Sequence, residues 1–131
     1  MENPKLQVLV VDDFATMRKI IRSALKQIGY EKIFEADDGA TALPILRDEP
    51  IGLVVTDWNM PRMSGLELLQ EIRTNPKNQH IPVVMVTAEG HKDNIIAAVK
   101  AGVDNYIVKP FKTEVLKEKI EQAFKKRNSS N

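Results

Sequence analysis

Three aspartates stand directly after short apolar runs that lie far apart in the chain. Asp12 and Asp13 follow VLVV at residues 8–11, and Asp57 follows LVVT at residues 53–56. Carboxylates that meet in one cleft repel each other, by roughly 1 kcal/mol per pair at about 4 Å in water and roughly 4 kcal/mol at an effective dielectric of about 20. A hard cation bound between them would remove this repulsion, and oxygen ligands favour Mg²⁺, with Mn²⁺ as a substitute.

The acidic pair has a second interpretation as the cap of a helix. Aspartate is common at helix N-caps, where the helix dipole favours negative charge, and a helix is predicted to begin near Phe14. For Asp12 and Asp13 alone, capping and metal binding are both open, and neither excludes the other. Asp57, at the end of a second strand, favours the metal site, and the backbone carbonyl of Asn59 can add a ligand from the same loop.

Two more predicted strands end in groups that can bind a phosphoryl group. VVMVTAE carries the hydroxyl of Thr87, and YIVKPF carries the ammonium group of Lys109. A cation, a hydroxyl and an ammonium group around one carboxylate suit a phosphoryl group, whose equatorial oxygens carry charge in the transition state. Because aspartate is ionised at neutral pH, Asp57 could attack phosphorus without a general base and form an aspartyl phosphate. Taken singly, Thr87 is more often an ordinary strand residue and Lys109 a solvated charge, but their joint position favours the phosphoryl site.

These residues are positioned by a repeated pattern of strand and helix. The predicted strands are residues 7–11, 32–36, 53–56, 83–87 and 106–108. Three of them are almost wholly apolar, which is typical of a parallel sheet covered on both faces. The run KIFEA at residues 32–36 alternates between apolar and charged residues, which predicts a strand at the edge of the sheet.

Segments of helical period fill the intervals between these strands. In the first interval apolar residues recur at steps of three and four and end at Gly29, which marks an amphipathic helix with a glycine stop. Its stripe consists of Met17, Ile20, Ile21, Ala24, Leu25 and Ile28. Further helices are predicted at residues 40–47, 66–73, 93–101 and 115–124.

Five such repeats predict a doubly wound, flavodoxin-like α/β fold of the (βα)5 type. We expect a single domain over residues 1–131, with a polar tail at residues 127–131 and a parallel five-stranded sheet of order 2-1-3-4-5. In such a sheet ligands bind in the crevice outside the carboxyl ends of the first and third strands. Asp12, Asp13 and Asp57 are therefore predicted to converge there.

The composition excludes several classes of function. Among 131 residues, 19 Lys and Arg stand against 18 Asp and Glu, and a formal charge of +1 provides no basic field for nucleic acid or an anionic membrane. The absence of cysteine excludes disulfides, thiolate catalysis and cysteine-ligated zinc. The N-terminal apolar run is too short for a signal peptide or a membrane span. We therefore expect a cytoplasmic protein. We also expect it to be a monomer.

Four motifs in order, VVDDF, DWNMPRMSG, MVTAE and VKPF, resemble those of receiver domains of the two-component response regulators. The resemblance covers nearly the whole chain and is strongest to the single-domain chemotaxis regulators of this family. It implies a signalling regulator, and not a turnover enzyme, that takes a phosphoryl group from a histidine kinase on Asp57 and loses it slowly. It also implies a cis peptide bond before Pro110. The implied site residues are Asp13, Asp57 and the Asn59 carbonyl for Mg²⁺, with Asp12 acting through water, and Thr87 and Lys109 for the phosphoryl oxygens.

The same resemblance implies a switch and an output surface. Thr87 would move towards the phosphoryl group and Tyr106 would rotate inward, whereas without the resemblance Tyr106 is a half-buried strand aromatic. Residues 95–99 are all apolar, more than one core-facing stripe can use, so Ile95 is predicted to be partly exposed. The partner would be the flagellar motor switch protein or another output protein, with a phosphatase as a possible further partner. The predicted partner surface is Ile95, Tyr106, Val108 and Lys119.

Three other functions match parts of this pattern. A flavodoxin-like electron carrier needs a Gly/Ser/Thr-rich phosphate loop after the first strand, where this chain has two carboxylates. An aspartyl-phosphate phosphatase carries a second acid two residues after its nucleophile, where this chain has Asn59. An adaptor or phosphate sink in another phosphorelay stays open, as do the roles in partner choice of His91, Lys92 and the tail at residues 127–131.

Overall fold

Strands and helices alternate along residues 5–88 and 92–129, which are the residues that the computed structural model describes. The strands are β1 (Gln7–Val11), β2 (Lys32–Ala36), β3 (Ile51–Asp57), β4 (Val83–Ala88) and β5 (Asn105–Lys109). The helices are α1 (Ala15–Ile28), α2 (Gly39–Asp48), α3 (Gly65–Thr74), α4 (Lys92–Lys100) and α5 (Thr113–Ser129). His91 lies outside these ranges. Within them, no helix combines the length and the apolar character needed to cross a bilayer.

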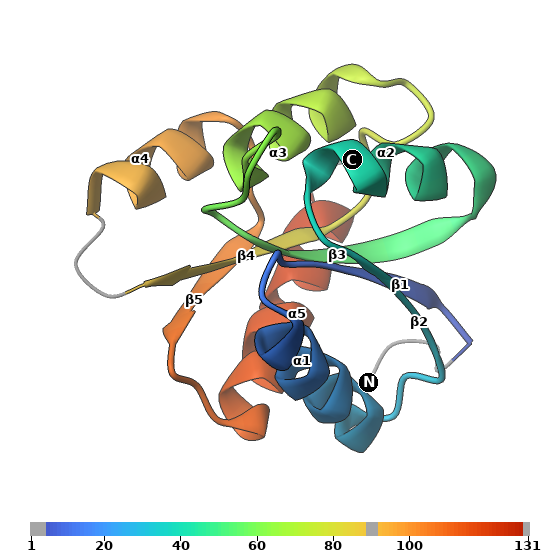
Figure 1. Cartoon of the computed structure of the whole chain (residues 1–131), viewed down its shortest axis with the longest axis vertical. Coiled ribbons are helices and arrows are strands. Elements are labelled where there is room, and N and C mark those ends of the chain that lie inside the picture. The colour runs from blue at the N-terminus through green and yellow to red at the C-terminus, as the bar shows by residue number, and fades with distance from the viewer. Residues whose placement is uncertain (1–4, 89–91, 130–131) are drawn as a thin grey trace.

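The strands form one parallel sheet of order β2-β1-β3-β4-β5, which confirms the predicted fold. Helices α1 and α5 cover one face of this sheet, and α2, α3 and α4 cover the other (Figure 1). The alternating run KIFEA forms the edge strand β2, as its pattern predicts. The winding direction reverses between β1 and β3, which are hydrogen-bonded neighbours at the centre of the sheet.

Successive residues of the inner strands contribute to two separate cores, because neighbouring side chains of a strand point to opposite faces. Val8 and Val10 of β1 pack with residues of α1 and α5, whereas Leu9 and Val11 pack with residues of α2, α3 and α4. All four side chains are fully buried. Burial on both faces explains why the inner strands read as continuous apolar runs, and it holds the ends of β1 and β3 firmly in place.

Several boundaries differ from the predicted ones. The sequence predicts that Asp57 and Lys109 directly follow β3 and β5. In the structure both strands are longer, and these two residues are their last ones. Helix α5 continues to Ser129, into the segment predicted as a polar tail. The reason is tertiary, because the Arg127 Nε atom donates a hydrogen bond to Asp104 Oδ1 at 2.7 Å and so fixes the last turns of the helix against the body of the protein.

Candidate functional site

Three carboxylates meet at the carboxyl end of the sheet. One oxygen from each of Asp12, Asp13 and Asp57 lies within 4.8 Å of the other two. Strands β1 and β3 bring them together because Val11 is paired with Thr56, so that the two chains reach the sheet edge at the same level. The convergence predicted from the strand ends is therefore present in the structure.

The three carboxylates differ in their surroundings. Asp13 is exposed, whereas Asp12 and Asp57 are only 1% and 7% exposed. The Phe14 N–H group donates a hydrogen bond to Asp12 Oδ1 at 2.9 Å, and Phe14 itself is the N-cap of α1, so neither aspartate caps this helix. Asp12 Oδ2 is buried and accepts no hydrogen bond from the described residues. Such a buried anionic oxygen needs a partner, which a cation or a water molecule bound to a cation can supply.

Lys109 contributes the positive charge of the site. Its Nζ atom donates a hydrogen bond to Asp57 Oδ1 at 3.0 Å and lies 3.8 Å from Asp12 Oδ2, so that one ammonium group faces both buried carboxylates. The Lys109–Pro110 peptide bond is cis, as the family resemblance implies. This arrangement partly neutralises the cluster, but the Lys109 ammonium alone does not balance three carboxylates.

The donor set therefore fits a hard divalent cation. Carboxylate oxygens on β1 and β3, one of them buried and without a hydrogen-bond partner in the described part of the chain, are ligands that Mg²⁺ prefers. Asn59 is exposed on the loop after β3, where its backbone carbonyl remains a predicted ligand. Among residues 5–88 and 92–129 no cysteine or histidine belongs to the cluster, and an all-carboxylate set disfavours zinc or copper.

The pKa of Asp12 reflects its burial and the charges of the cluster. Burial raises the pKa of its carboxyl group, and the charges of Asp57 and Asp13 raise it further, whereas the hydrogen bond from Phe14 and the charge of Lys109 lower it. The net effect is a raised pKa. The native protein thus binds this proton more tightly than the unfolded chain does, so the ionised Asp12 carboxylate costs stability when no metal is present.

Replacing Asp12 with asparagine should therefore stabilise the metal-free protein at neutral pH. Asparagine keeps an oxygen for the Phe14 N–H group but removes one repelling charge, and we expect the free energy of unfolding at about pH 7 to rise by on the order of 1 kcal/mol. Wild-type stability should itself rise as the pH falls through the raised pKa, so the advantage should vanish near the unfolded-state value of about 3.9. Thermal unfolding in EDTA across this range measures both effects, and a variant less stable than wild type at neutral pH would contradict a repulsive cluster.

Thr87 lies at the end of β4, beside the strand that carries Asp57. It is 2% exposed, and its hydroxyl makes only a long contact of 3.4 Å to the Ala88 carbonyl among the described residues. Asp57 is paired in register with Val86, one residue earlier on β4. Thr87 is therefore placed near the cluster, with a hydroxyl that makes no strong hydrogen bond to the described part of the chain.

Gly65, which sequence reasoning missed, allows the loop after Asp57 to close. A Cβ atom at this position would lie 2.1 Å from the Asp57 carbonyl oxygen, so no other residue fits without moving the backbone. The Gly65 N–H group donates a hydrogen bond to the Trp58 carbonyl at 2.9 Å. The available signal was its place directly after the Ser64 cap of α3, at the first helical position.

The predicted partner surface lies around a groove of about 480 Å³ between β5 and α5. Tyr106 and Val108 are half-buried in its wall, and the Lys119 ammonium lies 5.5 Å from the centre of the Tyr106 ring. Ile95 is half-buried on α4, as predicted. The more exposed apolar side chains of α4 are Ile96 and Val99, at 55% and 54%, and sequence reasoning did not single them out.

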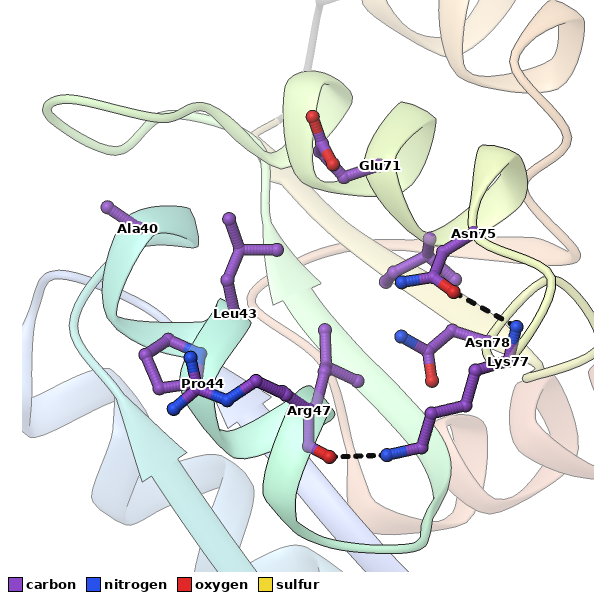
Figure 2. Close-up of a pocket in the computed structure, with 10 residues that line it drawn as sticks. Ala40, Leu43, Pro44, Arg47, Glu71, Asn75, Lys77 and Asn78 are labelled. Atoms are coloured by element: carbon purple, nitrogen blue, oxygen red, sulfur yellow. Dashed lines mark hydrogen bonds between the residues drawn. The ribbon is translucent and has the colours of Figure 1, made fainter.

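A second hollow, of about 370 Å³, lies between α2 and α3 (Figure 2). Both basic side chains of this pocket have partners. The Lys77 Nζ atom donates a hydrogen bond to the Arg47 carbonyl, and the Arg47 side chain forms an ion pair with Asp48 at 2.9 Å. Glu71 is the only carboxylate among its lining residues. This hollow therefore lacks the converging acids of the sheet edge and is not the candidate site.

Comparisons with known proteins agree with this geometry. A family profile described as the response regulator receiver domain matches residues 8–121. The chain is 51% identical over 123 residues to chemotaxis protein CheY of Pseudomonas aeruginosa, covering 94% of this chain and 99% of that protein. It is 48% identical over 124 residues to chemotaxis protein CheY-3 of Vibrio cholerae, covering 95% of each. The solved structure of the chemotaxis response regulator CheY4 of Vibrio cholerae is similar with a TM-score of 0.83, at 28% identity over 91% of this chain and 98% of that one. With the acidic cluster at the end of a 2-1-3-4-5 sheet, these similarities show that the chain belongs to the family of response regulator receiver domains.

Proposed function

We propose that Asp57 accepts a phosphoryl group from the phosphohistidine of a histidine kinase, with Mg²⁺ as cofactor and Mn²⁺ as its substitute. The observation that carries this proposal is the convergence of Asp12, Asp13 and Asp57 oxygens within 4.8 Å of one another. An Asp57 carboxylate oxygen forms a bond to phosphorus while the bond from phosphorus to the histidine nitrogen breaks. The electron pair stays on that nitrogen, and the leaving imidazole takes its proton from solvent.

The metal would be held by residues of two loops. Asp13, Asp57 and the Asn59 carbonyl would bind it directly, and Asp12 would act through water. When bound, Mg²⁺ supplies positive charge to the phosphoryl oxygens during the transfer. The exposed position of Asp13 leaves one side of the cluster open to solvent and to the phosphodonor.

Lys109 and Thr87 would bind the transferred phosphoryl group. The Lys109 ammonium, 3.0 Å from Asp57 Oδ1, can follow the negative charge as it spreads onto the phosphoryl oxygens. The Thr87 hydroxyl, whose contact to the Ala88 carbonyl is long at 3.4 Å, can turn towards another of these oxygens. Asn59 stands where a phosphatase would have a second acid to activate water, so the aspartyl phosphate should be lost slowly.

The phosphorylated chain would switch its affinity for an output partner. In the proposed switch Thr87 moves towards the phosphoryl group and Tyr106 rotates inward, beside the groove between β5 and α5. Phosphorylation shifts this equilibrium only through contacts that differ between the two conformers. The flagellar motor switch is the proposed partner, because relatives that are 51% and 48% identical to this chain are chemotaxis proteins. Such a pathway places the protein in the cytoplasm.

A phosphodonor titration tests the site. Trp58 directly follows the proposed phosphoacceptor and is half-buried, so its fluorescence should respond to Mg²⁺ and then to a small phosphodonor such as acetyl phosphate. The phosphodonor response should require Mg²⁺. A response of equal size in EDTA would rule out the metal-dependent transfer.

Replacing Lys109 with alanine should leave the chain folded and weaken the coupling of phosphorylation to output. The side chain is 25% exposed, so its loss opens little of the core, but it removes the cation that contacts Asp57. We expect the gain in partner affinity caused by phosphorylation to fall by about tenfold or more, because a charge-assisted hydrogen bond contributes about 1.5–3 kcal/mol. Affinity capture with and without beryllofluoride measures this, with Lys125→Ala on the exposed surface of α5 as the control. Full switching by the Lys109→Ala variant would contradict the role assigned to this lysine.

The alternative is a receiver that serves as adaptor or phosphate sink in another phosphorelay. It would keep the same site and differ only in its partner. Capture with and without beryllofluoride separates the two functions, because a motor-switch protein should bind the treated chain more tightly only if the output is flagellar. Preferential capture of a histidine-phosphotransfer protein would favour the alternative, and capture of a phosphatase would identify a further partner.

A further inference from the structure

The loop between β3 and α3, residues 58–64, is fastened to the start of α2, far away in the sequence. The Arg62 Nε atom donates a hydrogen bond to Asp38 Oδ2 at 2.5 Å, and the Gly39 N–H group donates to the Met63 carbonyl at 3.2 Å. One contact joins side chains and the other joins backbones. Together they hold the end of the loop at two neighbouring points.

The Asp38 carboxylate is held in a fixed position at the start of α2. Its side chain is fully buried, and Oδ1 accepts a hydrogen bond from the Thr41 N–H group at 3.0 Å, which caps α2. Its second oxygen is the one that binds Arg62. Arg62 also approaches Asp37 at 3.6 Å. A buried carboxylate needs such partners, so the acceptor for Arg62 is fixed in place before the loop meets it.

The loop adopts a conformation that is unfavourable by itself. Arg62 has a φ of 61°, and among the described residues it is the only residue other than glycine with positive φ. Such a backbone costs on the order of 1–3 kcal/mol and persists where its surroundings enforce it. Those surroundings are close, because a Cβ atom on Gly39 would lie 2.5 Å from the Met63 side chain. The loop rests directly on the first turn of α2.

The same segment is joined to the acidic cluster. The Asp12 N–H group donates a hydrogen bond to the Ala36 carbonyl at 3.1 Å, so the end of β2 is tied to the end of β1. Asp38 follows two residues later and holds Arg62. The hydrogen bond and the ion pair thus connect the end of β1, the end of β2 and the loop after β3. Asn59, the proposed carbonyl ligand, lies in that loop.

We propose that the Asp38–Arg62 ion pair positions the loop after β3, and with it the Asn59 carbonyl, for binding of the divalent cation. This inference rests on the proposed function, since it concerns the same metal site. Both residues are positioning residues, because neither contacts the carboxylate cluster. Outer contacts of this kind typically change metal affinity by about 10- to 100-fold when they are removed.

Two matched substitutions test the proposal. Asp38→Asn keeps the oxygen that caps α2 and removes the charge that binds Arg62. Arg62→Asn removes the guanidinium group and keeps a residue that tolerates positive φ, so that the backbone is not strained further. The control is Arg47→Gln, which removes an exposed arginine of α2 whose partner is its neighbour Asp48. Arg62→Lys should restore part of any loss, because it returns the charge.

The first measurement uses no metal and no phosphodonor. Amide hydrogen exchange of Gly39, followed by NMR in EDTA, should become faster in both test variants and remain unchanged in the control. The second measurement is a titration with MgCl₂ followed by Trp58 fluorescence, in which the dissociation constant should rise by about tenfold in both variants. The double variant should be no weaker than the weaker single one, because both substitutions break the same ion pair.

The outcomes separate this inference from the proposed function. If wild type binds Mg²⁺ and both test variants bind it equally well, the positioning role is overturned, whatever the exchange rates. A titration in which wild type shows no response to Mg²⁺ overturns the metal site itself, and the positioning role with it. Weaker binding that appears equally in the Arg47→Gln control would also overturn the role, because the effect would then come from loss of positive charge alone.

Discussion

An Asp57→Asn variant should incorporate no phosphoryl group from acetyl phosphate in the presence of Mg²⁺. Asparagine has nearly the shape of aspartate, but its amide lacks the anionic oxygen that forms the bond to phosphorus, so we expect complete loss and not a slower rate. It also removes one charge from the cluster and the acceptor charge that Lys109 contacts at 3.0 Å. The measurement is radiolabel bound to the protein and released by hydroxylamine, which cleaves acyl phosphates.

Two controls make this experiment decisive. Asp48→Asn removes an exposed carboxylate that pairs with its neighbour Arg47, and this variant should be labelled as wild type is. Circular dichroism of the Asp57→Asn variant should show an intact fold, because asparagine fills the same space at the end of β3. Undiminished labelling of the Asp57→Asn protein at another residue would end the assignment of Asp57 as phosphoacceptor.

Removal of the Asp104 carboxylate should cause the largest loss of stability. This side chain is fully buried and accepts three hydrogen bonds, from the Val83 N–H group at 2.8 Å, from Arg73 at 2.6 Å and from Arg127 at 2.7 Å. Burial lowers the pKa of Arg73, and the charge of Asp104 acts against this by raising it. Without Asp104 two guanidinium groups would face each other without a counter-charge. Breaking such a buried pair typically costs about 3–5 kcal/mol, which is our expectation for Asp104→Ala.

Urea unfolding measures this loss of stability. A titration with Mg²⁺ tests whether the substitution leaves the metal site unchanged. Asp104 accepts a hydrogen bond from Val83 at the amino-terminal end of β4, whereas the carboxylate cluster lies at the carboxyl ends of β1 and β3. The Mg²⁺ dissociation constant of the folded Asp104→Ala variant should therefore equal that of wild type. Asp48→Ala, with its exposed ion pair, should lose less than about 1 kcal/mol. If Asp104→Ala lost as little stability as Asp48→Ala, the expectation would be contradicted. Water would then reach the two arginines and replace the carboxylate.

The local pattern of the chain was enough to predict the fold. The predicted bounds of β1 and β2 agree with those of the structure, and the apolar runs of the inner strands indicated a sheet covered on both faces. Strand and helix periods are properties of neighbouring residues, so they can be read without knowing the fold. The same reading placed Asp12 and Asp57 at strand ends, because a charged residue ends an apolar run.

What the sequence could not supply were contacts between segments that are distant along the chain. The pairing of Arg62 with Asp38 spans 24 residues and that of Arg73 with Asp104 spans 31, and no periodicity marks either partner. The exposure of Ile96 and Val99 likewise depends on how α4 rotates against the sheet, since the run at residues 95–99 is apolar throughout.

By itself the sequence determined the order of the elements, the chemistry available at each strand end and, through the four motifs, the family. Only the tertiary structure decided how deeply each carboxylate is buried, that the Lys109 ammonium lies against Asp57, and that Asp12 Oδ2 is buried without a hydrogen-bond partner among the described residues. The physical reason is that side-chain patterns set which face of an element is apolar, whereas distances between charges depend on how the packed layers bring those elements together.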